Sequence, residues 1–106
     1  MFSIISMRQL EWYLDRKRNG ELEFTLLDVR SPEEFAAGHL TGAVNLPMES
    51  PEGAWRQLDQ DDPVIVYCGH GSKSLMAVRM LDQMGYLVMA SAGGLASYRG
   101  KYYKSI

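Results

Sequence analysis

Short apolar runs alternate with helix-like segments along this chain, and this alternation limits the fold more than any other feature. Residues 24–29 and 64–67 form runs that are apolar on both faces, as expected of strands buried inside a parallel sheet. Apolar residues with helical spacing follow the second run. Strands joined through helices imply right-handed crossovers. The pattern therefore predicts an α/β fold with a mainly parallel sheet covered on both faces.

The same periodicity, with its glycine and proline punctuation, predicts the individual elements. Strands are expected over residues 2–5, 24–29, 43–46, 64–67 and 86–90. Helices are expected over residues 7–18, 32–37, 72–84 and 95–103, with a turn or two around 54–58. Two helix starts are sharply marked, because Ser6 precedes Gln9 and Ser31 precedes Glu34 at the spacing of a capping box.

Size and charge exclude several classes of protein. The 106 residues fit one globular domain, residues 1–106, with a formal net charge of −2. No strong basic field or long apolar run suggests nucleic acid or a membrane as a partner. The first residues lack the pattern of a secretory leader, so we expect a cytoplasmic protein. One cysteine, Cys68, cannot form an internal disulfide and should stay reduced there.

Cys68 stands where an α/β sheet binds ligands, at the carboxyl end of the strand over residues 64–67. The glycines after it allow several backbone N–H groups to point inward, and the next helix adds its positive end. These groups, with Lys73 nearby, favour the nucleophilic thiolate form of Cys68. The alternative is a small buried hydrophobic residue, which is common for free cysteine. A glycine-rich loop gives up packing volume for backbone donors, so its position favours the catalytic interpretation.

The segment CGHGSKS, residues 68–74, resembles the active-site loop of the rhodanese (sulfurtransferase) family. Residues 28–47 (DVRSPEEFAAGHLTGAVNLP) resemble the first signature of that family over its whole length. Gly93, Gly94 and Leu95, followed by Tyr98, are similar to the closing signature. Together these segments cover most of the chain in the order of a single rhodanese domain. The resemblance implies a rhodanese-like three-layer fold with a five-stranded parallel sheet flanked by helices.

The resemblance also implies a chemistry. Cys68 would take sulfane sulfur from thiosulfate or a persulfide donor, carry it as a persulfide, and pass it to cyanide or a thiol. No cofactor and no metal is expected. Backbone donors of the loop would stabilise the anionic sulfur. The expected site therefore consists of catalytic Cys68 and the substrate-binding residues Gly69, His70, Gly71, Ser72, Lys73 and Ser74.

Two features of the loop bear on its specificity. Lys73 stands where the loops of the family often carry arginine, which keeps the charge and loses the planar fork. Related phosphatases and arsenate reductases space cysteine and arginine with five intervening residues, whereas residues 69–72 leave four. A shorter cradle suits a sulfur atom better than a phosphate. His70 could meet an anionic donor, or could be a solvated loop residue.

A second function stays open, in which the chain is a protein-binding sulfur-relay module. Cys68 would then pass its persulfide to a partner protein, and turnover of free thiosulfate would be incidental. His70 alone offers little to select a small substrate. A mixed disulfide trapped through Cys68 would favour this alternative.

Several other residues have a structural interpretation. Asp28 and Arg30 end their strand near the mouth of the expected site, where they could contribute to the chemistry, but we favour a structural role. In that role Arg30 pairs with Glu34 and Asp28 accepts backbone donors from a neighbouring loop, while His39 is expected to be a satisfied turn histidine. With one cysteine and two distant histidines, we expect no structural zinc site. Gap-filling in the core is expected of Met76, Met80, Met84 and Met89. Trp55, in an irregular segment, could be exposed as part of a docking rim.

Overall fold

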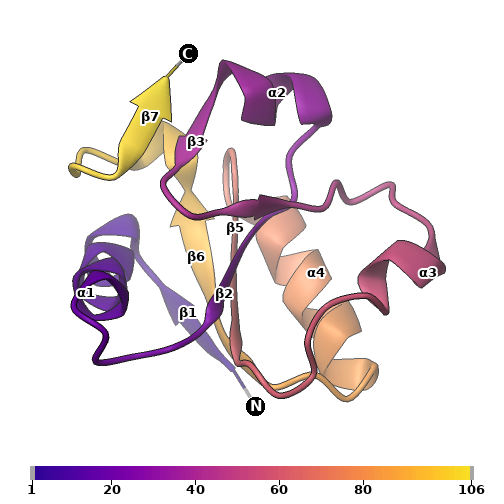
Figure 1. Cartoon of the computed structure of the whole chain (residues 1–106). Coiled ribbons are helices and arrows are strands. Elements are labelled where there is room, and N and C mark those ends of the chain that lie inside the picture. Colours follow the sequence, from indigo (N-terminus) through magenta and orange to yellow (C-terminus); the bar gives the residue numbers. More distant parts are fainter. Residues whose placement is uncertain (1, 106) are drawn as a thin grey trace.

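The computed structural model describes residues 2–105, so Met1 and Ile106, the end residues of the expected domain, lie outside the described part. Its strands are Ser3–Ile5 (β1), Thr25–Asp28 (β2), Gly38–Leu40 (β3), Val44–Asn45 (β4), Val64–Cys68 (β5), Val88–Gly94 (β6) and Tyr103–Ser105 (β7). Its helices are Met7–Arg18 (α1), Pro32–Ala37 (α2), Glu52–Trp55 (α3) and Ser72–Gln83 (α4), with a 3-10 turn at Leu95–Ser97 (η1). Strands and helices alternate along most of the chain (Figure 1).

Among the described residues, five strands form one parallel sheet in the order β1-β6-β5-β2-β4. All five correspond to strands expected from the sequence, and the predicted α/β class and parallel sheet are confirmed. The order places β5 in the centre, buried over its whole length. Cys68 lies at the carboxyl end of this strand, so neighbouring strands on both sides hold its backbone in place.

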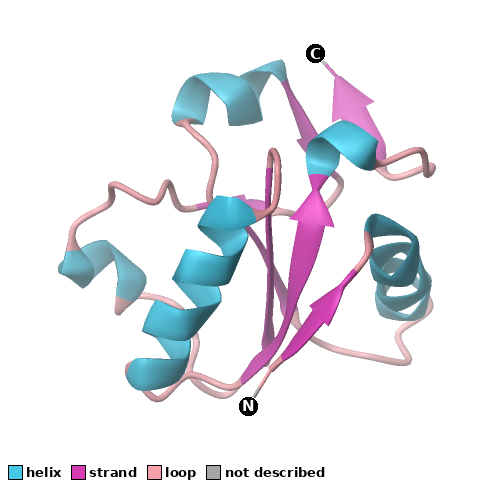
Figure 2. Ribbon diagram, turned by 180° about the vertical axis from the view of Figure 1, so that it is seen from behind, coloured by secondary structure: helices cyan, strands magenta, loops and turns pink. Residues whose placement is uncertain are grey.

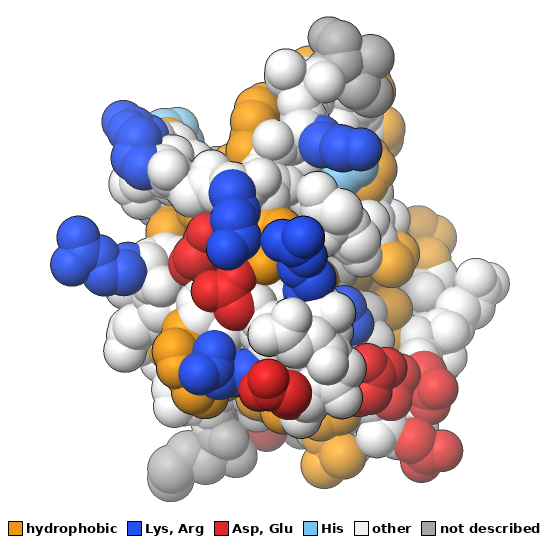
Figure 3. All heavy atoms as spheres, turned by 60° about the vertical axis from the view of Figure 1, so that its left-hand side comes forward, with side chains coloured by type: hydrophobic (Ala, Val, Ile, Leu, Met, Phe, Trp, Pro, Cys, Tyr) orange, Lys and Arg blue, Asp and Glu red, His pale blue; other side chains and the backbone are white. Residues whose placement is uncertain are grey.

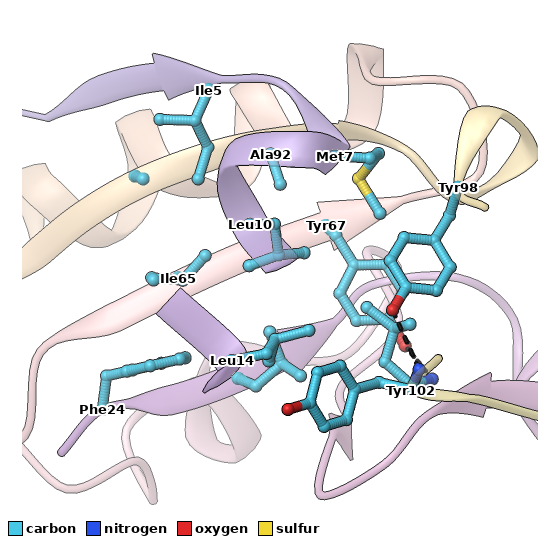
Figure 4. Close-up of a cluster of buried hydrophobic side chains, with 13 residues drawn as sticks. Ile5, Met7, Leu10, Leu14, Phe24, Ile65, Tyr67, Ala92, Tyr98 and Tyr102 are labelled. Atoms are coloured by element: carbon cyan, nitrogen blue, oxygen red, sulfur yellow. Dashed lines mark hydrogen bonds between the residues drawn. The ribbon is translucent and has the colours of Figure 1, made fainter. Parts of the chain in front are cut away.

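Helices cover both faces of this sheet, as Figures 1 and 2 show from opposite sides. On one face α1 packs Met7, Leu10 and Leu14 into a core cluster with Ile65 and Tyr67 of β5. Figure 4 shows these side chains pointing toward one another. On the other face α3 and α4 pack against a second cluster that includes Cys68. The two clusters hold β5 from both sides and fix the position of the cysteine.

The predicted helix starts are confirmed at both capping boxes. Ser6 Oγ accepts from Gln9 N at 3.1 Å while Ser6 N donates to Gln9 Oε1 at 2.8 Å. Ser31 and Glu34 repeat the arrangement at α2, with proline at the first helical position. Each box satisfies backbone donors that a helix start leaves free.

The helix predicted over residues 95–103 is wrong. The chain makes only the short η1, turns to extended backbone at Tyr98, and ends in β7, which pairs antiparallel with β3. Tyr98 and Tyr102 do point into the core, which explains the helix-like spacing of apolar residues (Figure 4). The Tyr98 hydroxyl donates to Glu11 and accepts from Tyr102 N, so tertiary contacts replace helical hydrogen bonds.

Smaller corrections concern burial and element ends. Trp55 is 2% exposed, and its indole N–H donates to Ser50 O at 3.0 Å, so it forms no docking rim. Met76 faces solvent on α4, at 57% exposed, instead of filling the core. The turn expected at 54–58 begins earlier, in α3. The strand expected at 86–90 is shifted toward the carboxyl end, in β6, because its pairing with β1 and β5 continues past Ala90.

Charges of both signs mix on the face that carries α1, where Lys and Arg side chains lie among Asp and Glu (Figure 3). Arg16 lies over the Trp12 ring at 4.0 Å from its centre, Lys17 donates to Phe24 O, and Lys101 pairs with Asp15 at 3.0 Å. Each of these three basic side chains therefore already has a partner within the chain. No helix in residues 2–105 has the length and apolar character needed to cross a membrane.

Candidate active site

Cys68 ends the central strand and lies under the start of α4. Its side chain is 1% exposed. The chain leaves β5, turns through Gly69 and His70, and enters α4 from Gly71, which has φ +98°. That left-handed conformation is readily available to glycine and strained for other residues. The turn is thus encoded locally, which is why the sequence predicts it.

The sulfur of Cys68 is surrounded by hydrogen-bond donors of the loop. Gly71 N donates to Sγ at 2.9 Å and Ser74 N at 3.3 Å, and Ser74 Oγ lies 3.5 Å from the same sulfur. The two N–H groups belong to the positive end of α4. An anion at Sγ would meet these donors without any rearrangement of the loop, so the geometry is preorganised for a thiolate.

A cavity of about 110 Å³ opens over Cys68, lined by Arg30, Glu34, Cys68, Gly69, His70, Ser72 and Lys73. Five of the seven residues expected at the site line it, and the other two, Gly71 and Ser74, bond the sulfur directly. The structure therefore brings all seven together. Sequence reasoning favoured a purely structural role for Arg30 and gave Glu34 no place at the mouth of the cavity.

Lys73 stands at the rim and not against the sulfur. Its Nζ lies 3.7 Å from Glu49 Oε1, and the two side chains are 48% and 73% exposed. Among the described contacts of Sγ, the donors are the backbone N–H groups of Gly71 and Ser74, while the thiol itself donates to Ser74 Oγ. The positive field at the sulfur thus comes first from the loop backbone, while Lys73 acts at the entrance.

The sequence suggested that Arg30 pairs with Glu34. In the structure Arg30 pairs with Asp28 instead. Its Nη2 lies 2.8 Å from Asp28 Oδ2 and 2.6 Å from Gly38 O, while its Nε lies 3.1 Å from both Asp28 oxygens. Asp28 accepts from the backbone N of Arg30 itself, at 2.9 Å, and not from a neighbouring loop. Burial opposes the charge of Arg30, but the Asp28 carboxylate outweighs it and raises the pKa of the guanidinium. The pair forms a fixed wall of the cavity.

The Glu34 carboxylate caps α2 through Ser31, and its attraction to Arg30 is a weaker, longer-range one. Hydrogen bonds from Ser31 N and Ser31 Oγ lower the pKa of Glu34, so its charge persists at the cavity. His39 has a hydrogen-bond partner as expected, because its Nδ1 lies 2.7 Å from Phe35 O and its ring stacks on that of Phe35, but it lies in β3 and not in a turn. Within residues 2–105, no three His, Cys, Asp or Glu side chains gather as metal ligands.

A larger hollow of about 520 Å³ adjoins the Cys68 cavity. The two share Arg30, Glu34, Gly69 and His70, and the hollow continues along Leu95, Ala96, Tyr98, Arg99, Gly100 and Tyr103. The outer wall comes from η1, the loop after it and the first residue of β7, all within the segment 95–103 that the sequence pattern had predicted as one helix. Because that helix was wrongly predicted, the sequence did not reveal the hollow. Gly100, inside the predicted helix, was the signal against it.

Gly94 lets β6 pass against the active-site loop. A Cβ at this position would overlap the Gly69 carbonyl and lie 2.5 Å from His70 Cα, and Ala96 N also bonds Gly69 O at 3.1 Å. We expect Gly94→Ala to lower the unfolding free energy by about 1–3 kcal/mol and to displace the loop. Urea unfolding and the rate of Cys68 alkylation check this. Gly53→Ala, on α3 with open space around it, is the control. Unchanged stability and alkylation in Gly94→Ala would contradict the packing argument.

Comparison with known proteins agrees with this geometry. The sequence profile of the rhodanese-like domain matches residues 9–101. The thiosulfate sulfurtransferase GlpE of Pseudomonas putida is 38% identical over 88 residues, 82% of this chain and 77% of that protein. The rhodanese-like domain of an Anabaena protein superposes with a TM-score of 0.81 at 29% identity, over 100% of this chain and 81% of the other. A rhodanese of E. coli solved with anions superposes with a TM-score of 0.64 at 33% identity, over 77% of this chain and 98% of the other. The chain belongs to the rhodanese-like domain family.

Proposed function

We propose that this chain is a sulfurtransferase that carries sulfane sulfur as a persulfide on Cys68. The observation that carries the proposal is the buried Sγ, which accepts hydrogen bonds from Gly71 N and Ser74 N at the start of α4. A strand end, a thiol and a helix start in this order place the sulfur where backbone donors can stabilise its negative charge during the reaction. The relative GlpE is named a thiosulfate sulfurtransferase, and membership of the family supports the same reaction class.

In the first half-reaction the Cys68 thiolate attacks the outer sulfur of thiosulfate. The new bond joins Sγ to that sulfur, the bond between the two sulfurs of thiosulfate breaks, and its electron pair leaves with sulfite. The product is the persulfide anion Cys68–S–S⁻, so the total charge of −3 is conserved. The cavity over Sγ has room for the outer sulfur. His70, Ser72 and the N–H groups from Gly69 onward are the groups that would hold donor and product.

In the second half-reaction an acceptor takes the outer sulfur. Cyanide attacks it, the bond to Sγ breaks, and Cys68 leaves as a thiolate while thiocyanate forms. A thiolate acceptor reacts in the same way and leaves as a persulfide. The donors at Sγ now stabilise the leaving group, so one set of N–H groups serves both half-reactions.

Assays with thiosulfate and with a phosphate ester distinguish sulfur transfer from phosphatase activity. We expect turnover of thiosulfate with cyanide and no measurable hydrolysis of p-nitrophenyl phosphate, because the loop leaves four residues between Cys68 and Lys73 and the cavity is small. Thiocyanate and p-nitrophenol are measured by absorbance. Phosphate hydrolysis through Cys68 without thiocyanate formation would overturn the proposal.

The charges at the rim should tune reaction with anionic donors. Lys73→Gln is expected to lower kcat/KM for thiosulfate about three- to tenfold, because it removes a cation from the entrance. Glu49→Gln removes the partner of Lys73 and should act in the opposite direction. Both effects should shrink at high ionic strength, since both side chains are exposed. Steady-state kinetics in low and high salt check this, and an unchanged value in both variants would remove Lys73 from donor binding.

A second candidate, a sulfur relay to a partner protein, is favoured by the hollow beside the cavity. Its volume of about 520 Å³ exceeds what thiosulfate or cyanide needs, and Leu95, Tyr98 and Tyr103 give it an apolar wall. Rates with thiosulfate, glutathione persulfide and a cysteine desulfurase as donors separate the two candidates. A rate with the desulfurase far above the others, with a mixed disulfide through Cys68, would assign the relay.

The proposal extends to location and boundaries. We assign the protein to the cytoplasm, where the single thiol would stay reduced. Residues 1–106 are proposed to act as one domain. The acceptor of the outer sulfur is cyanide or a small thiol, and the proposed reaction uses no cofactor or metal.

A further inference from the structure

Ser91 is a buried polar residue on β6 that the reaction above does not use. It is 2% exposed and lies opposite Val66 in the register between β5 and β6. A buried hydroxyl costs free energy unless it finds a partner. The Ser91 hydroxyl donates to Ser74 Oγ at 3.1 Å. Its partner is therefore a side chain that itself contacts the nucleophile.

Ser74 connects Ser91 to Cys68. Its Oγ lies 3.5 Å from Cys68 Sγ, 2.9 Å from Gly71 O and 3.0 Å from Ala92 O. A hydroxyl has one proton and two acceptor lone pairs, so Ser74 cannot donate to both carbonyls and to the sulfur at once. The bond from Ser91 occupies one lone pair and restricts the rotation of the Ser74 hydroxyl.

The two protonation states of Cys68 place opposite demands on Ser74. The neutral thiol donates its proton to Ser74 Oγ, and the Ser74 proton then goes to a carbonyl. The thiolate has no proton, so Ser74 must donate its own to Sγ. In that state the donors run in one direction, from Ser91 to Ser74 to Sγ. A hydroxyl that accepts one hydrogen bond donates the next more strongly.

We propose that Ser91 is a positioning residue whose hydroxyl orients and polarises Ser74 so that Ser74 stabilises the Cys68 thiolate. The thiolate is the attacking group in the first half-reaction and the leaving group in the second, and that consequence rests on the proposed sulfur transfer. The effect on the thiol itself needs no sulfur donor. Other charged or titratable groups face the same cavity: Arg30, Glu34, His70 and Lys73. They are unchanged in the variants below.

Alkylation of Cys68 against pH tests the proposal, because the chain has no other cysteine. With iodoacetamide, Ser91→Ala should move the midpoint of the rate profile upward by about half to one pH unit. Ser91→Thr and Ser91→Val form a matched pair of equal shape that differ in the hydroxyl. Threonine should keep the midpoint near that of the wild type, and valine should shift it as alanine does. kcat/KM for thiosulfate should fall about threefold to tenfold in the alanine and valine variants.

Val88→Ala, on the same strand at the end far from Cys68, controls for loss of packing. It should lower stability and leave the midpoint in place. An unmoved midpoint in Ser91→Ala, or equal midpoints in the threonine and valine variants, would overturn the proposal. A shifted midpoint in an enzyme that transfers no sulfur would support the role of Ser91 and reject the proposed function, so the two failures are distinguishable.

Discussion

Cys68→Ser is expected to reduce sulfur transfer from thiosulfate to cyanide by at least about a thousandfold. Serine is similar in shape, but its hydroxyl stays protonated near neutral pH and forms no persulfide. The donors at Gly71 N and Ser74 N would remain in place around the new oxygen. Thiocyanate formation over time is the measurement.

The loss must be chemical and not a failure to fold. The side chain is buried and bonded within its own loop, so the serine variant should keep an unfolding free energy within about 1 kcal/mol of the wild type. Urea unfolding followed by tryptophan fluorescence provides this control. A folded variant that retains a tenth of the activity would contradict the assignment of Cys68 as the sulfur carrier.

Asp28→Asn is expected to lower the unfolding free energy by about 3–5 kcal/mol, because it leaves the Arg30 guanidinium buried without a carboxylate. Asp28 is fully buried, and the Arg30 side chain is 10% exposed. The variant should also lower sulfur transfer, since Arg30 lines the Cys68 cavity. Urea unfolding measures the stability, and thiocyanate formation the activity.

The exposed pair of Arg56 with Glu52, at 3.3 Å, is the matched control. Glu52→Gln should change stability by less than about 0.5 kcal/mol, because water screens that pair. The double variant Asp28→Asn with Arg30→Met should recover part of the loss, since no unpaired charge remains. Equal losses from Asp28→Asn and Glu52→Gln would contradict the importance of burial.

Much of the fold is predictable because its signals are local. The capping boxes at Ser6 and Ser31 depend on residues three apart, and the apolar runs of β2 and β5 mark strands buried on both faces. Such signals survive without knowledge of the tertiary structure. The parallel sheet then follows, because strands joined through helices are typical of parallel pairing.

The carboxyl-terminal segment is not predictable in this way. Tyr98 and Tyr102 have helix-like spacing, but their hydrogen bonds run to Glu11, to Asp15 and between themselves. Pairing of β7 with β3 joins residues far apart in sequence. Tertiary contacts therefore override the local pattern, and the hollow they form cannot be predicted from it.

The candidate site also has a part that the sequence predicts and a part that it does not. Residues 68–74 are contiguous, so the loop that holds the sulfur is visible in the sequence. Partners that come from distant segments are not visible there: Glu49 beside Lys73, and Ser91 behind Ser74. Ser91 gives a weak signal, because it is a polar residue in a strand of mostly small apolar residues. Its partner, however, is determined by the register between β6 and β5.

The intact mass of the protein after treatment with thiosulfate and removal of excess reagent tests the central claim most directly. The account predicts a gain of one sulfur atom that is lost on addition of cyanide and never forms in Cys68→Ser. Glutathione persulfide and a cysteine desulfurase serve as further donors in the same measurement. A wild-type mass that stays unchanged with all three donors would contradict the account.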